Sequence, residues 1–202
     1  MKKILIALFI LALNVMFTNS NTVYASGFDP DYYARKYPDV AASCGNDSGA
    51  LFKHYMEYGI FEGRFQNAQE EASGTAVGMA GATYIDIDIA NQTVVYYSEG
   101  VPVLTTDCVT GNTSEGNDTP KGFFHIENKV PGKYLVGPTW NVWADRWMRF
   151  TGNVGLHDAS WRSKFGGEIY KTNGSHGCVN LPSDVAKSLY DMVEVGTAVF
   201  VH

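Results

Sequence analysis

Alternation of apolar and acidic residues near position 85 constrains the fold of this chain more than any other feature. Isoleucine and aspartate alternate over five positions, which is the period of a half-buried β-strand. The run is Ile85, Asp86, Ile87, Asp88 and Ile89. Turn residues separate it from two more strand-like runs, at residues 93–97 and 101–109. The order predicts two successive hairpins, with the acids on a solvent face rather than in a metal site.

Signals beyond residue 110 are also mostly those of strands. Strand-like runs occur at residues 123–126 and 197–201, and a helix is predicted to begin near Pro182 and to stop at Gly196. Residues 132–150 carry three tryptophans without a helix or strand period. We expect them to form an aromatic loop that covers one end of the sheet or contacts a substrate. The sequence therefore predicts a mainly β fold with one helix.

A run rich in glycine, serine and asparagine, residues 155–182, holds the chemically reactive side chains. These are His157, His176 and Cys178. A thiol is a useful nucleophile as the thiolate, and a nearby imidazole is the usual group that removes its proton. Gly174 and Gly177 allow a sharp turn that aims backbone N–H groups at one point, as an oxyanion hole requires. The pattern favours catalysis by a nucleophilic cysteine.

Two other interpretations of these side chains stay open. A single cysteine is frequently a small buried hydrophobe, and single histidines are frequently structural. His157, His176 and Cys178 are also zinc-ligand types, although no fourth ligand is evident and the sequence has no paired CxxC or HxxxH spacing. His125 lies on a predicted strand away from this run and is interpreted as structural.

A hexapeptide in this run carries a family resemblance. Residues 175–180 read Ser-His-Gly-Cys-Val-Asn, and with His157 upstream they resemble the active-site motif of the L,D-transpeptidases, the YkuD domain. The similarity covers residues 80–202. It takes in residues 84–89, 119–122, 155–159, 165–167 and 182–201. The resemblance implies a β-sandwich-like or barrel-like catalytic domain with one or two helices and with the cysteine at the rim of a sheet.

Roles in the chemistry follow from the motif. We assign Cys178 as the nucleophile and His157 as the base that takes the thiol proton. The backbone N–H groups of Gly177 and Cys178 are predicted to form the oxyanion hole. Asp158 follows the base, and either its carbonyl or its carboxylate is expected to orient the imidazole.

Supporting roles are assigned to five further residues. His176 is expected to position the catalytic loop by hydrogen bonds, and Ser175 and Asn180 to fix the turn. Asn180 stands where other family members carry arginine, which leaves open how a substrate carboxylate is recognised. The region of Tyr134 and Trp147 borders the peptide-binding cleft in the family, so both are predicted to contact substrate.

The resemblance also implies a reaction on peptidoglycan stem peptides, one as donor and one as acceptor. Family members release D-alanine from the donor, hold the acyl group as a cysteine thioester and pass it to a side-chain amine of another stem. The product is a 3→3 cross-link. No cofactor, metal or ATP is implied, and carbapenem-type inhibitors are expected to acylate the cysteine. An L,D-carboxypeptidase and a non-catalytic wall-binding protein are the alternatives.

Residues 1–25 have the pattern of a secretory signal peptide. Two lysines precede an apolar run at residues 4–17 and a small-residue cleavage site at residues 23–25. The run is shorter than the roughly 20 residues of a membrane span, although an uncleaved anchor is the alternative. We expect an exported protein, extracellular or at the cell wall, without a stable membrane span. The formal charge of −6 offers no basic surface for nucleic acid.

Residues 27–66 are predicted to form a small helical module of their own. Asp29-Pro30 and Ser48 are helix-start signals, and Gly59 is a stop signal. The module resembles a short helical unit of bacterial surface proteins, which acts as a spacer or as a wall-binding module. No motif residue lies there, so the chemistry is expected not to need it. Residues 67–79 are predicted to be a flexible linker to the catalytic domain at residues 80–202.

The chain has three cysteines, at positions 44, 108 and 178. An odd number leaves at least one thiol free, and a catalytic Cys178 must be that one. A bridge between Cys44 and Cys108 would tie the helical module to the catalytic domain. The sequence leaves this bridge open, because it does not place the two residues within reach of each other.

Overall fold

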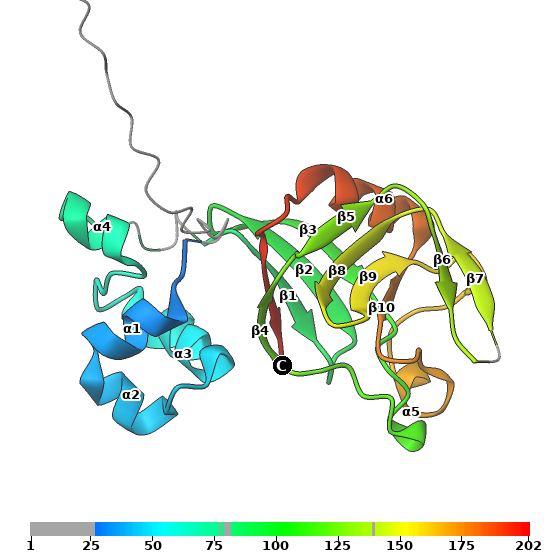
Figure 1. Ribbon diagram of the computed structural model, residues 1–202, viewed down its shortest axis with the longest axis horizontal. Helices are drawn as coiled ribbons and strands as arrows, with labels where there is room; N and C mark the ends of the chain where they lie inside the picture. The colour runs from blue at the N-terminus through cyan, green and yellow to red at the C-terminus, as the bar shows by residue number, and fades with distance from the viewer. Residues whose placement is uncertain (1–26, 77, 79–81, 139) are drawn as a thin grey trace, which may run out of the picture.

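The computed structural model describes residues 27–76, 78, 82–138 and 140–202. Figure 1 shows a group of short helices at one end of the molecule and a β-rich body at the other. The predicted signal peptide, residues 1–25, lies outside the described residues. Within the described ranges, no helix combines the length and the apolar composition needed to cross a membrane.

Five strands form the first sheet, in the order β3-β2-β1-β11-β4. Their bounds are β1 (Tyr84–Asp88), β2 (Thr93–Ser98), β3 (Val101–Asp107), β4 (Gly122–His125) and β11 (Ala198–Val201). Gln92 and Glu99 adopt positive φ angles of 54° and 51° in the turns that follow β1 and β2, which closes both predicted hairpins. Strand β11 runs parallel to β1, so the last strand of the chain lies inside the sheet.

Four strands form the second sheet, in the order β10-β9-β8-β5. Their bounds are β5 (Asn128–Val130), β8 (Trp147–Thr151), β9 (Val154–Asp158) and β10 (Val179–Leu181). Strands β9 and β10 are parallel, and their register places Asn180 beside His157. The sheet thus brings together two motif residues that are 23 positions apart.

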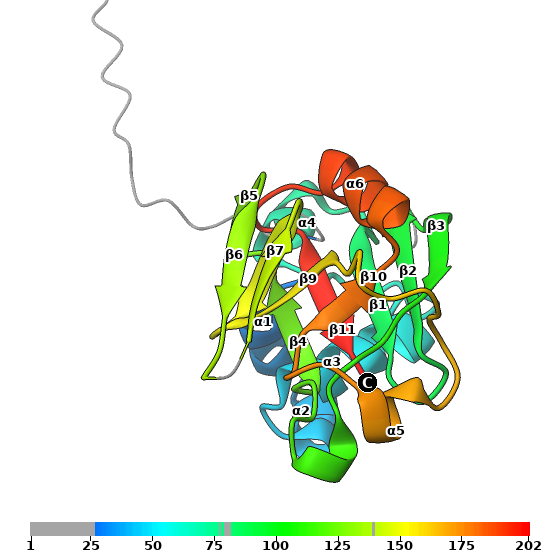
Figure 2. The ribbon, with the colours of Figure 1, turned by 90° about the vertical axis from the view of Figure 1, so that its right-hand side faces the viewer.

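The main core lies between the two sheets and under helix α6 (Ser183–Met192). Apolar side chains from both sheets are fully buried there, together with Ala186 and Leu189 of the helix. Figure 2 shows α6 lying across one end of the strands. Removal of apolar surface from water is the main driving force for folding, so this core holds the two sheets and the helix together. The prediction of a mainly β, sandwich-like part with few helices is confirmed.

The prediction of an irregular aromatic loop at residues 132–150 is wrong. Strands β6 (Lys133–Val136) and β7 (Asn141–Ala144) form a two-stranded hairpin there, and β8 follows directly. The tryptophans of this region interrupt the simple alternation, because Trp143 packs edge-to-face on Tyr134 across the hairpin rather than facing a core. Cross-strand aromatic pairs of this kind stabilise a hairpin without a period-two pattern.

Short helices occupy the N-terminal part of the described chain. They are α1 (Pro30–Lys36), α2 (Pro38–Cys44), α3 (Ser48–His54), the π-helical turn η1 (Tyr55–Gly59) and α4 (Ala68–Ser73). Asp29 caps α1 as predicted, by accepting a hydrogen bond of 2.9 Å from the Tyr32 N–H. Asp47, rather than Ser48, caps α3. Helix α4 lies within the segment predicted as a flexible linker, and Glu71 ties it to α1 by accepting a 2.7 Å hydrogen bond from the Tyr32 hydroxyl.

This helical unit packs on the outer face of the first sheet. Phe52 is buried, and its ring centroid lies 4.7 Å from that of Phe123 and 5.4 Å from that of Phe200. Helix α3 approaches β4 so closely that a Cβ atom on Gly49 would lie 3.1 Å from the Cα of Gly122. The outer face of this sheet is therefore covered by aromatic side chains and is not a solvent face along its whole length. The resemblance of residues 27–66 to a surface-protein unit stays a prediction.

Candidate active site

Cys178 follows a tight turn that joins helix α5 (Ile169–Asn173) to β10. Gly177 has a φ of +113°, a conformation that side chains rarely adopt. The Ser175 hydroxyl accepts a 3.0 Å hydrogen bond from the Gly177 N–H and donates to the Cys178 carbonyl. Thr119 donates a 2.8 Å hydrogen bond to the Gly177 carbonyl. Ser175 therefore fixes the turn, in the way that its position in the motif suggests.

The same turn contains the two backbone N–H groups predicted to form the oxyanion hole. The N–H of Gly177 already donates to Ser175, so it is not directed at the cavity in this state. The N–H of Cys178 remains the candidate donor from this turn. An oxyanion hole needs donors that are directed toward the developing charge, so the Gly177 N–H would first have to leave Ser175 to serve as one.

His157 lies on β9 and is almost completely buried. Its Nδ1 atom is 2.8 Å from the backbone carbonyl of Asp158. The carboxylate of Asp158 points elsewhere and accepts a 2.8 Å hydrogen bond from the N–H of Arg146. The imidazole also lies near two indole rings, with centroid distances of 5.8 Å to Trp147 and 5.9 Å to Trp161. The carbonyl of Asp158, not its carboxylate, therefore contacts the His157 ring.

The other ring nitrogen of His157 faces Asn180. The Nε2 atom lies 3.0 Å from the amide nitrogen of Asn180, which is also buried. The Cys178 sulfur lies 3.8 Å from the carbonyl oxygen of Asn153, and among the described side chains no hydrogen bond joins it directly to His157. The side chain of Asn180 therefore contacts His157 rather than the turn that precedes Cys178. Catalytic hydrogen bonds frequently tighten only when substrate is bound.

The electrostatics of the site favour a neutral resting pair. Burial raises the pKa of the Cys178 thiol above its ordinary value, against a backbone hydrogen bond from Gly155 and the charge of Lys133. Burial lowers the pKa of His157, against the hydrogen bond and charge of Asp158. Both directions favour a protonated thiol beside a neutral imidazole over a thiolate–imidazolium pair.

A cavity of about 640 Å³ connects these side chains. Cys178 and His157 line it, together with Tyr134 and Trp147, so the structure brings both predicted substrate contacts to the site. Trp147 is buried against His157, whereas Tyr134 is 60% exposed on the hairpin. Trp147 thus forms part of the cavity wall beside His157, and Tyr134 is the more exposed of the two side chains.

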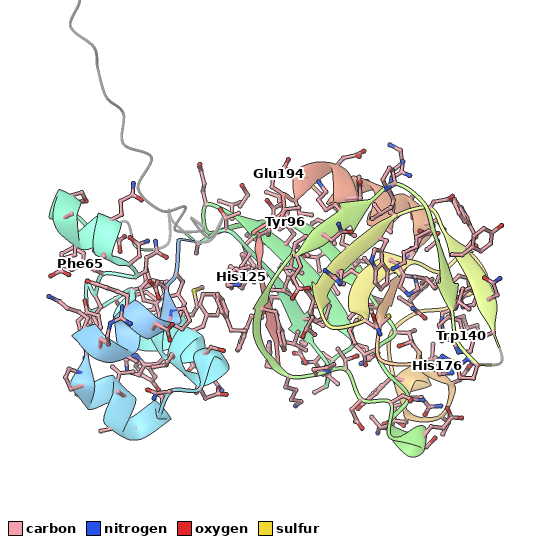
Figure 3. The ribbon with its side chains drawn as sticks, in the orientation of Figure 1. Phe65, Tyr96, His125, Trp140, His176 and Glu194 are labelled. Carbon is pink, nitrogen blue, oxygen red and sulfur yellow. The ribbon has the colours of Figure 1, made fainter. Side chains whose placement is uncertain are left out.

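His176 contacts the hairpin by stacking rather than by the hydrogen bonds that we expected. Its ring lies 4.9 Å from that of Trp140 at an interplanar angle of 22°. Figure 3 shows both side chains together at the end of the molecule opposite the helical unit. Both also line the cavity. This stack connects the catalytic turn to the tip of the β6–β7 hairpin.

The comparison with protein families decides the identity of this site. Residues 82–201 match the family described as the L,D-transpeptidase catalytic domain, YkuD. The chain belongs to the L,D-transpeptidase family. A comparison with curated proteins gives no match.

Solved L,D-transpeptidase structures share the fold of this domain. An Enterococcus faecium L,D-transpeptidase with a cysteine-to-serine substitution aligns with 40% identity and a TM-score of 0.56, over 59% of this chain and 49% of that chain. The Enterococcus faecium catalytic domain acylated by ertapenem aligns with 38% identity and a TM-score of 0.52, over 59% and 96%. A Mycobacterium smegmatis L,D-transpeptidase aligns with 27% identity and a TM-score of 0.52, over 59% and 58%. The present chain spans about half the length of the first of these proteins.

Three residues of this L,D-transpeptidase site were not predicted from the sequence. Arg162 and Trp161 lie in the excursion between β9 and α5, and Lys133 begins the hairpin. Arg162 could have been noticed as a charged residue within the glycine-rich run beside the motif. No sequence pattern singles out Lys133. Among the described residues, no group of three or more histidine, cysteine or acidic side chains is placed to hold a metal ion, so the zinc interpretation gains no support.

Cys44, Cys108 and Cys178 are all free thiols in this structure. The bridge that the sequence left open between Cys44 and Cys108 is therefore not formed. Burial raises the pKa of the Cys108 thiol, so that thiol is unreactive. Packing of aromatic side chains, rather than a disulfide, connects the helical unit to the L,D-transpeptidase domain.

Proposed function

We propose that this chain is a peptidoglycan L,D-transpeptidase that forms 3→3 cross-links through a Cys178 thioester. The observation that carries the proposal is the placement of Cys178 and His157 on one cavity within the catalytic domain of this family. A nucleophile and a base at one accessible cavity are the minimum that acyl transfer requires. Both are intact, which disfavours a non-catalytic wall-binding role.

The reaction begins with attack of the Cys178 sulfur on the carbonyl of the third stem residue. His157 takes the thiol proton, and the Cys178 N–H stabilises the oxyanion. The bond to D-alanine then breaks, and His157 delivers the proton to the leaving amine. A side-chain amine of a second stem attacks the thioester, its proton passes through His157, and the thiol is restored. The free energy of the broken amide is carried over in the thioester, so the cycle needs no ATP.

The charge of the cavity supports an anionic substrate. The chain as a whole is acidic, with a formal charge of −6. The described residues that line the cavity nevertheless include Lys133 and Arg162 and no acid. A cleft lined by one sign of charge concentrates ligands of the opposite sign. Stem peptides end in a carboxylate, and Lys133 is a candidate for its recognition.

We also propose that the protein acts outside the membrane, at the cell wall.

An L,D-carboxypeptidase is the second candidate, because it passes through the same thioester. It differs only in that water, rather than an amine, reaches the acyl group. An amine competes with water only if the site holds the amine close and shields the thioester. Trp140 and Trp147 line the cavity and provide apolar walls for such shielding. Trp143 does not line it and packs on Tyr134 instead. These walls favour transpeptidation.

The first prediction concerns the products. The purified protein, incubated with a disaccharide tetrapeptide, is expected to give dimers with 3→3 links and free D-alanine, because the shielded thioester reacts with the bound amine. Mass spectrometry of the products measures both. Tripeptide monomers alone, at every substrate concentration, would identify a carboxypeptidase. No release of D-alanine would contradict both functions.

The second prediction concerns inhibitors. The Enterococcus faecium catalytic domain is acylated by ertapenem, and we propose the same reaction at Cys178 here. Incubation with ertapenem is expected to increase the intact mass by one drug molecule, and peptide mapping should place the adduct on Cys178. Buried Cys108 serves as the internal control. An adduct that forms equally in a Cys178→Ala variant would contradict the prediction.

A further inference from the structure

Arg162 makes two directed hydrogen bonds behind the base. Its Nε donates to the Oδ1 atom of Asn180 at 2.8 Å, and its Nη1 donates to the carbonyl of Asn173 at 2.9 Å. Asn173 is the last residue of α5. The guanidinium therefore connects the loop between β9 and α5, in which Arg162 lies, to strand β10 and to the end of α5. Asn180 in turn lies against His157.

The hydrogen-bonding capacity of each side chain decides which atoms donate and which accept in this series of contacts. Arginine has only donors, so the atom of Asn180 that it touches must be the carbonyl oxygen. The amide N–H of Asn180 must then point at Nε2 of His157, 3.0 Å away. A backbone carbonyl only accepts, so Nδ1 of His157 carries the ring proton that faces Asp158. The Nε2 atom is left with a lone pair, which accepts from Asn180.

We propose that Arg162 is a positioning residue that holds His157 in the neutral form with its proton on Nδ1, by fixing the orientation of the Asn180 amide. This inference rests on the proposed function, in which His157 is the base. A base must be unprotonated to take the nucleophile's proton. The hydrogen bonds from Arg162 to Asn180 and from Asn180 to His157, called the clamp below, keep Nε2 unprotonated before substrate arrives, with its lone pair accepting from Asn180. The Asn180 N–H must leave this lone pair when the thiol proton is transferred.

The same contacts disfavour the imidazolium form. A proton on Nε2 would face the Asn180 amide N–H, which is a donor against a donor. Rotation of the amide would relieve that contact but would turn its N–H toward the Nε–H of Arg162. The imidazolium is consequently a stronger acid than an unclamped one, which helps it to deliver the thiol proton to the leaving amine.

The other charged groups near His157 are few. The Asp158 carboxylate is engaged by the Arg146 N–H, and the Lys133 ammonium lies over the Trp147 ring at 4.8 Å from its centroid. The Cys178 thiol lines the same cavity. Burial and the charge of Arg162 lower the pKa of His157 in the same direction as the clamp, while Asp158 opposes them. The test must therefore separate the hydrogen bond of Arg162 from its charge.

Two substitutions separate these contributions. Arg162→Gln keeps a donor at the same place, because the amide nitrogen of glutamine is attached to Cδ as Nε is in arginine, but it removes the charge. Arg162→Met has similar length and removes both. Lys164→Met is the matched control, since it removes an exposed positive charge two residues away. Both Arg162 variants lose the bond to Asn173, so that loss cancels in the comparison.

The full-length protein and its variants are compared in three measurements. These are the ¹⁵N NMR shifts of His157, the pH dependence of kcat/KM for D-alanine release, and the rate of Cys178 alkylation by iodoacetamide, followed on its peptide. The expected wild-type result is a neutral Nδ1–H tautomer at neutral pH. In Arg162→Met, Asn180 is free to turn its oxygen to Nε2, so the pKa of His157 rises by about one unit, the size of one net hydrogen bond.

Opposite changes in two rates follow from that increase. The acidic limb of the kcat/KM profile moves up by about one pH unit, and Cys178 alkylation at neutral pH becomes about tenfold faster, because the imidazolium stabilises the thiolate. Simple damage to the site would lower both rates and leave the midpoint unchanged. Lys164→Met is expected to keep the wild-type midpoint. Arg162→Gln is expected to move the midpoint up by less than Arg162→Met does, because it removes the charge but keeps the hydrogen bond to Asn180.

Three results would overturn the inference. They are a charged or Nε2–H imidazole in the wild type, equal midpoints in Arg162→Met and wild type, or equal displacement in Arg162→Gln and Arg162→Met. The last result would assign the effect to charge alone. The NMR and alkylation measurements do not require turnover. Absence of D-alanine release would therefore contradict the proposed function while the role of Arg162 is still decided.

Discussion

Cys178→Ala is expected to abolish release of D-alanine from tetrapeptide stems while the protein stays folded. The variant has no atom that can attack the carbonyl, so kcat should fall by about a million-fold, the scale observed when a covalent nucleophile is removed from a hydrolase. The side chain is only half-buried at the rim of the second sheet. Its truncation should therefore change the free energy of unfolding by about 1 kcal/mol or less. Product analysis and urea denaturation measure the two effects.

Cys44→Ala is the matched control for this experiment. It removes a second half-buried thiol, on α2 in the helical unit, away from the catalytic turn. We expect it to retain wild-type turnover. Appreciable D-alanine release by Cys178→Ala would contradict the thioester mechanism, even if the family assignment still holds. Equal loss in both variants would instead indicate general damage to the protein.

The catalytic turn could be predicted from sequence because its chemistry is local. A glycine with positive φ, a serine two residues before it and the cysteine directly after it define the geometry within a few bonds. The strands of the first sheet were predictable for a similar reason. Ile85 and Ile87 alternate with polar residues, and both are fully buried in the structure.

The surroundings of His157 could not be predicted in the same way. Asn180 reaches His157 because β9 and β10 are parallel neighbours, and their register follows from the whole sheet rather than from the motif. Arg162 comes from an irregular excursion whose path no periodicity describes. His176 stacks on Trp140 because the hairpin extends over the catalytic turn. Contacts between elements that are distant in sequence thus decide how the His157 ring is held.

The position of the helical unit was the feature that the sequence predicted least well. Its helix-start signals at Asp29 and Pro30 correctly predicted a helix, but such signals do not describe the surface that the helix covers. Tyr84 and Phe200 occupy alternate positions that the strand pattern assigns to an outer face. In the structure they are packed against the aromatic side chains of the helical unit. The expectation that the chemistry does not need this unit has to be tested against that contact.

Phe52→Ala is expected to destabilise the whole protein although it lies far from the active site. Phe52 is 1% exposed, and its ring contacts Phe28 in the helical unit and Tyr84 and Phe123 in the first sheet. Truncation of a buried phenylalanine costs about 3–5 kcal/mol, which is a large part of the stability of a small protein. Urea denaturation, followed by far-ultraviolet circular dichroism and tryptophan fluorescence, measures the loss.

Phe61→Ala is the control, because Phe61 is 78% exposed on the same helical unit and its truncation should change stability by about 0.5 kcal/mol or less. The four tryptophans lie at position 140 or beyond, so fluorescence reports on the catalytic domain alone. If the helical unit and the sheet share one core, Phe52→Ala must shift the fluorescence transition and the circular dichroism transition together. Figure 3 places Trp140 and His176 at the opposite end of the molecule from Phe65 in the helical unit, so turnover by the folded variant should stay close to wild type. An unchanged fluorescence transition in Phe52→Ala would show that the catalytic domain does not depend on the helical unit for its stability.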